Sequence, residues 1–270
     1  MFYKGYVIGA SFSRGLGLHF YDRVKRNKKC NYDCNYMEHL FNYKNSFSFI
    51  TNQKLDISWP IIASQVTFFD EIDWVSEQIQ NETKDDYLKT KLVVIQLSNP
   101  QRNFIFEGNM YKVSFESEES LKKSVDAILK NKPIFFANRF YNAIDTFLKD
   151  DNKFSEENWG FIIDKLNTLI ESNLKKNVIT KIISYGHDYS EIEYLNEIID
   201  NSLVKIEYNN EEYDCVDRFV NKNKLRVKDD LGIDDDHPNF EAHKIIADSI
   251  CNSIKKHKLY WNKWDEHQLI

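Results

Sequence analysis

The stretch YVIGASFSRGLG (residues 6–17) begins with an apolar run that stops at Gly9, followed by two serines and two further glycines. A short continuous apolar run is typical of a strand covered on both faces of its sheet. Comparable runs predict further strands at residues 46–51, 91–98, 177–184 and 202–209. We therefore predict a first strand over residues 3–10, with Ser11 just beyond its carboxyl end.

Helices are predicted between these strands, where apolar residues recur at three- and four-residue spacing. They cover residues 68–82, 117–131, 156–176 and 238–257. This alternation predicts an α/β fold with a mainly parallel central sheet, whose functional crevice lies beyond the carboxyl ends of the strands. Because no internal repeat or linker-like segment interrupts the pattern, we expect a single domain over residues 1–270. Residues 24–45 are expected to form an insertion loop. Residues 258–270 are expected to form an aromatic C-terminal tail that either packs on the body of the protein or allows self-association through its tryptophans.

Composition narrows the class of protein. The formal net charge is −6, which argues against a general nucleic-acid binder. Four cysteines in 270 residues do not make a disulfide framework. The chain shows no signal-peptide pattern and no run of about 18 apolar residues, so we expect a cytoplasmic protein without a membrane partner.

His237 is the histidine with the most distinctive surroundings. It lies in GIDDDHPNFEAH (residues 232–243), directly after three aspartates and before the predicted start of the last helix. An aspartate two or three residues earlier can accept a hydrogen bond from the imidazole Nδ1 and fix its tautomer, as required of a general base. Such a base would activate a serine hydroxyl, which is otherwise a poor nucleophile. The same residues also fit an acidic turn that caps the last helix.

Asn99 follows the strongest predicted strand, in VVIQLSNPQRN (residues 93–103). A side-chain amide at the carboxyl end of this strand can donate a hydrogen bond to a developing oxyanion. The alternative is that Asn99 and Pro100 form only a turn.

In their order along the chain, these three segments resemble the SGNH, or GDSL-type, serine hydrolase family. That family places its nucleophile serine after the first strand, an asparagine after the third, and an Asp-x-x-His pair before the last helix. Here GAS (residues 9–11), LSN (residues 97–99) and DDDH (residues 234–237) occupy these places. The segment LDISWPIIAS (residues 55–64) also looks like the start of a helix common in the family. The resemblance implies a three-layer α/β/α sandwich, similar to that of flavodoxin, over nearly the whole chain.

The resemblance also implies roles for individual residues. Ser11 would be the nucleophile, with Ser13 as a weaker candidate. His237 would be the general base and acid, oriented by Asp234 or, alternatively, Asp235. The oxyanion hole would combine the Ser11 backbone N–H with the Asn99 side chain. No glycine occurs between Gly17 and Gly108 to supply the family's second backbone donor.

Two further residues are expected near the same crevice. Arg102, after the third predicted strand, and His187, after the fourth, are candidate substrate-binding residues. Ordinary surface and loop roles remain open for both of them.

The resemblance implies an esterase that needs no metal and no cofactor. Its expected substrate is a small-molecule or carbohydrate ester, such as an acetyl ester, cleaved through an acyl-enzyme. An acyltransferase and a catalytically inactive carbohydrate-binding module remain as alternatives. A phosphate-handling enzyme that uses Arg102 has no Gly-rich phosphate loop to support it. Cys30, Cys34 and His39 fall short of the four ligands typical of structural zinc.

Overall fold

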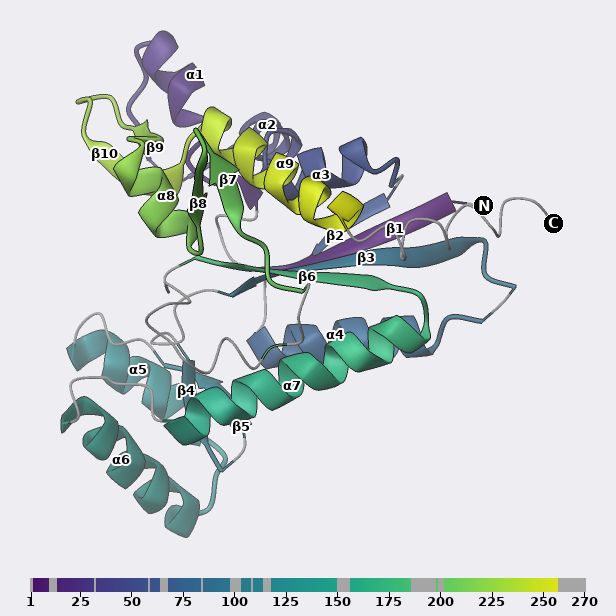
Figure 1. Cartoon of the computed structure of the whole chain (residues 1–270). Coiled ribbons are helices and arrows are strands. Elements are labelled where there is room, and N and C mark those ends of the chain that lie inside the picture. Colours follow the sequence, from purple (N-terminus) through teal and green to yellow (C-terminus); the bar gives the residue numbers. More distant parts are fainter. Residues whose placement is uncertain are drawn as a thin grey trace.

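The computed structural model describes most of the chain: residues 2–9, 14–31, 33–57, 59–63, 68–83, 85–97, 103–107, 109–113, 118–149, 156–185, 198 and 202–256. At its centre is a four-stranded sheet in the order β2–β1–β3–β6, in which all neighbouring strands are parallel (Figure 1). These strands are β1 (Phe2–Ile8), β2 (Trp59–Ala63), β3 (Leu88–Leu97) and β6 (Ile179–Ser184). The predicted parallel sheet with intervening helices is confirmed.

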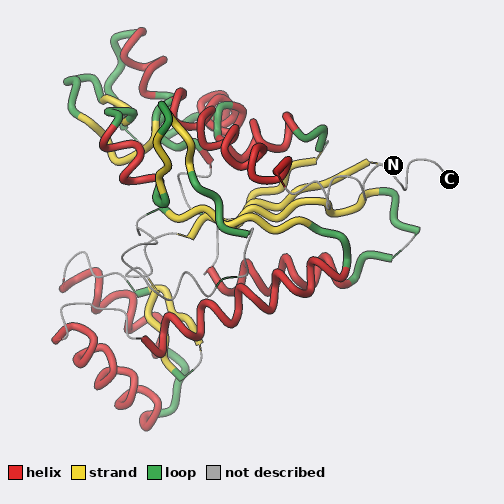
Figure 2. Tube along the Cα trace, in the orientation of Figure 1, coloured by secondary structure: helices red, strands yellow, loops and turns green. Residues whose placement is uncertain are grey.

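Helices pack on both faces of this sheet (Figure 2). On one face, α3 (Phe47–Lys54) and α9 (Phe240–Lys256) bury an apolar cluster that includes Val7, Val94 and Ile250. On the other face, α4 (Phe68–Gln80) and α7 (Glu156–Lys175) bury a second cluster around Ile95 and Ile163. Since successive strand residues point to opposite faces, the continuous apolar strands supply both clusters.

Smaller elements lie at the end of the sheet where the strands finish (Figure 1). The antiparallel pairs β7–β8 and β9–β10 flank helix α8, and α1 and α2 lie beside them. Their bounds are α1 (Phe20–Lys25), α2 (Tyr36–Lys44), β7 (Ile206–Tyr208), β8 (Glu211–Tyr213), α8 (Val216–Lys222), β9 (Arg226–Lys228) and β10 (Asp234–Pro238). Helix α2 therefore lies inside the expected insertion loop 24–45. Among the helices that the structure describes, none combines the length and apolar character needed to cross a membrane.

A small α/β unit follows β3 and has its own core. It contains β4 (Asn103–Phe106), β5 (Asn109–Lys112), α5 (Glu118–Leu129) and α6 (Ile134–Lys149). Its core is largely aromatic, because Phe104 and Phe140 contact each other edge to face and pack beside Phe147. Sequence analysis predicted only α5 of this unit.

Two assignments from the sequence were wrong. Residues 46–51, predicted as a strand, belong mainly to helix α3, because the Ser46 hydroxyl accepts a hydrogen bond from the Phe49 N–H and caps a new helix. Residues 55–64, interpreted as the start of a helix, instead contain strand β2, which pairs with β1. The strand predicted at 202–209 is only partly present. It makes one parallel bridge to β6 at Leu203 and then turns into the β7–β8 hairpin.

Candidate active site

The candidate general base, His237, forms a close pair with Asp235 on β10. The Asp235 Oδ1 atom lies 2.5 Å from His237 Nδ1 and also accepts the His237 backbone N–H at 2.9 Å. Both side chains are largely buried, at 10% and 14% exposure for His237 and Asp235 respectively. A neutral imidazole that donates through Nδ1 carries its lone pair on Nε2. The pair therefore has the tautomer that a general base requires.

Of the two candidate orienting residues, Asp234 and Asp235, it is the alternative candidate, Asp235, that contacts the imidazole. The pairing of β10 with β9 is irregular between Asp234 and Pro238, and in this segment the Asp235 carboxylate turns back to contact both the backbone N–H and the Nδ1 of His237. The carboxylate of Asp234 lies 3.8 Å from Lys228 Nζ, and both of these side chains are more than half exposed.

Gly17 brings the turn after β1 against this pair. A Cβ atom on Gly17 would lie 3.4 Å from the His237 Cβ and 3.6 Å from the Asp235 Oδ1. The backbone φ of Gly17 is +91°, a value that favours glycine. The contact joins segments far apart in the sequence. Sequence analysis did not single out Gly17, although its place in a serine- and glycine-rich stretch after a strand was a usable signal.

The parallel strands finish side by side at one edge of the sheet. Ile8, the last residue of β1, pairs with Ile95 of β3, and Leu97 pairs with Ser184 of β6. The Tyr185 N–H then donates to the Leu97 carbonyl at 2.9 Å. The segments that leave these three strands therefore start from neighbouring positions.

Several predicted site residues follow these strand ends and lie outside the described residues. They are Ser11, Ser13, Asn99, Arg102 and His187. The expected C-terminal tail also lies outside the described part of the chain. Of the predicted catalytic set, the structure therefore describes His237, Asp234 and Asp235.

A second histidine, His243, is completely buried beneath the site. Its Nδ1 accepts the Phe47 backbone N–H at 3.1 Å, which joins α9 to the start of α3. Its Nε2 has no hydrogen-bond partner among the described residues. Burial, together with the nearby His237, lowers the pKa of His243 to about 3. His243 is therefore neutral in the folded protein and acts as a structural acceptor.

This buried histidine predicts a loss of stability in mild acid. Below pH 6.5 the unfolded chain binds a proton at His243 that the folded chain does not bind until about pH 3, so folding becomes less favourable as the pH falls. Between pH 7 and pH 5 this one group costs about 2 kcal/mol of unfolding free energy. Urea unfolding at the two pH values measures the loss. His243→Asn, which keeps an acceptor but does not titrate, should remove most of it, and an unchanged loss would contradict the assignment.

Cys34 contacts His19 between β1 and α2, and the surrounding hydrogen bonds indicate a structural role for this contact. Cys34 Sγ lies 3.3 Å from Nε2 of the buried His19. Both ring nitrogens already have partners, because Nε2 contacts the Asn31 carbonyl and Nδ1 the Asn42 side chain, each at 2.9 Å. Burial also raises the pKa of the Cys34 thiol, which disfavours the reactive thiolate. The contacts of His19 with Cys34 and Asn42 therefore hold the turn after β1 against helix α2.

The described residues offer no site of the kind that holds a metal ion. Within them, no group of three or more histidine, cysteine or acidic side chains gathers as metal ligands would. His39, considered with Cys30 and Cys34 in the sequence, is exposed on α2.

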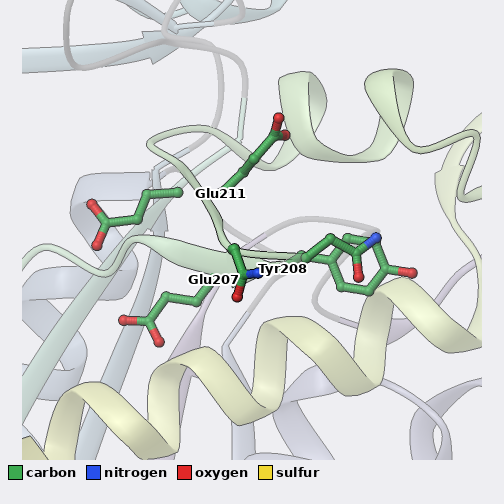
Figure 3. A pocket seen from close by; sticks show the side chains of 6 residues that line it. Glu207, Tyr208 and Glu211 are labelled. Carbon is green, nitrogen blue, oxygen red and sulfur yellow. The ribbon is translucent and has the colours of Figure 1, made fainter.

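An acidic hollow at the β7–β8 turn is a separate feature (Figure 3). Two of its three carboxylates form ion pairs, Glu211 with Lys222 at 2.8 Å and Glu212 with Lys205 at 3.3 Å. The Tyr208 hydroxyl donates to Glu241 of α9 at 3.1 Å. These contacts explain the hollow as part of the hairpin's surface, so we assign it no ligand.

No family model, curated protein or solved structure matches this chain in comparisons with known proteins.

Proposed function

We propose that this chain is a serine hydrolase of the SGNH type that removes a small acyl group, such as acetyl, from a carbohydrate or another small metabolite. The observation that supports the proposal most directly is the His237–Asp235 pair, which is packed against the turn that follows β1. Ser11 precedes Gly17 by only six residues in the sequence, a length of chain that spans at most about 20 Å. The family's three-layer α/β/α sandwich is part of the proposal and is supported by the helices on both faces of the sheet.

In the proposed reaction, His237 Nε2 takes the proton of the Ser11 hydroxyl as its oxygen attacks the ester carbonyl. Asp235 holds the ring through Nδ1 and stabilises the imidazolium that forms. The Ser11 N–H and the Asn99 amide would donate to the oxyanion. The imidazolium then protonates the leaving alcohol, and a water activated by the same histidine releases the carboxylic acid and restores the serine. Arg102 and His187 are proposed substrate contacts beside this centre, and no metal or cofactor takes part.

Labelling with a fluorophosphonate probe tests this function. The expected result is one labelled peptide that contains Ser11, with labelling lost in Ser11→Ala and retained in Ser13→Ala. Hydrolysis of 4-nitrophenyl acetate should be lost in the same variant. A folded wild-type protein that is neither labelled nor active would refute the proposal and leave a binding module as the better description. Assays with an added sugar acceptor then separate a hydrolase from an acyltransferase.

A further inference from the structure

Three aromatic rings form a cluster around Phe240, which lies close to His237 in the sequence. Phe240, the first residue of α9, lies 4.9 Å from the ring of Tyr21 on α1 and 5.5 Å from the ring of Phe41 on α2, centroid to centroid. Phe240 is the third residue after His237, so the two are joined by at most about 10 Å of chain. We call Tyr21, Phe41 and Phe240 the aromatic platform.

The platform is partly open to solvent and supported from below. Tyr21 is 39% exposed and Phe41 is 36% exposed. Phe240 packs against a small buried cluster of Leu18, Phe20 and Val227. Aromatic side chains have few rotatable bonds, and rings packed in this way lose little further entropy when a ligand binds.

A hydrogen-bonded residue connects the platform to the proposed active site. The Tyr21 side chain is hydrogen bonded to Asn239. Asn239 lies two residues after His237, and its Oδ1 caps α9 by accepting the Ala242 N–H at 3.0 Å. The rings are thus held in a defined position relative to the strand that carries the Asp235–His237 pair.

We propose that the aromatic platform binds a sugar ring of the substrate, which makes an O-acylated glycan the substrate class of the proposed hydrolase. A sugar ring has an apolar face of C–H groups that suits the electron-rich face of an aromatic ring, and its hydroxyls remain in water. Tyr21 and Phe41 lie at the surface of the protein, so a ligand bound on them keeps its outer side in water. This arrangement favours an amphipathic ring over a fatty acyl chain, which needs an enclosed apolar pocket.

This inference rests on the proposed function, and a binding experiment separates the two. Ser11→Ala protein is titrated with an O-acetylated xylo-oligosaccharide by calorimetry, so that no turnover occurs. Adding Phe41→Leu or Tyr21→Leu to this protein should weaken binding about tenfold. Each leucine keeps apolar volume but removes the aromatic face. The matched control is Tyr87→Leu, an exposed tyrosine just before β3 that is not in the platform.

The outcomes are distinct. Binding that is about tenfold weaker in both platform variants, but unchanged in the control, supports the inference. Equal affinity in all variants, or no binding to the Ser11→Ala protein, would overturn it. A wild-type protein that hydrolyses 4-nitrophenyl acetate in a Ser11-dependent manner but fails this binding test retains the proposed function and loses the glycan assignment. Binding that depends on the platform, without any ester hydrolysis, would instead refute the proposed hydrolase function and retain the assignment of a glycan as the ligand.

Discussion

His237→Gln should lower kcat for 4-nitrophenyl acetate by about 10⁴-fold or more, because glutamine cannot accept the serine proton. His237 is largely buried, so folding of the variant must be measured alongside its activity. The circular dichroism spectrum and the urea midpoint provide that check. The control is His39→Gln, at an exposed histidine of α2, which should retain full activity. A well-folded His237→Gln protein with near wild-type turnover would remove His237 from the mechanism.

Asp235→Asn should lower kcat by about 10⁴-fold, whereas Asp234→Asn should change it less than about twofold. An asparagine at 235 can present its amide N–H₂ to Nδ1, which stabilises the wrong imidazole tautomer and leaves the imidazolium without a counter-charge. The two substitutions remove the same charge from adjacent positions, so each controls for the general electrostatic effect of the other. Steady-state kinetics of both variants at saturating ester decides the assignment. The reverse order of effects would make Asp234 the orienting residue.

The choice between these aspartates shows what the sequence could and could not predict. The resemblance to a family favoured Asp234 because it assumed an Asp-x-x-His spacing before the last helix. The structure has an irregular stretch of β10 between Asp234 and Pro238, in which the Asp235 carboxylate contacts both the backbone N–H and the Nδ1 of the histidine two residues later. Three consecutive aspartates in the sequence do not reveal which of them turns back in this way.

Much of the sheet was predictable, because β1, β3 and β6 are continuous apolar runs buried on both faces. The prediction failed around Ser46, where three closely spaced aromatic and aliphatic residues suggested a strand. A single hydroxyl cap and packing against α9 made the segment a helix. Contacts across the fold, such as Gly17 with His237 and Phe41 with Phe240, could not be predicted. They depend on how distant segments meet, which local periodicity does not encode.

The contact between Gly17 and the Asp235–His237 pair on β10 also determines when this part of the protein can assemble during synthesis. The turn that follows β1 is translated before the other three strands of the central sheet, and its packing partners on β10 are translated after them. Domains generally fold as units, with earlier parts waiting for later ones. A nascent chain that stops before β10 therefore contains all four strands of the sheet but lacks the Asp235–His237 pair, so the contact with Gly17 can form only after β10 has been translated.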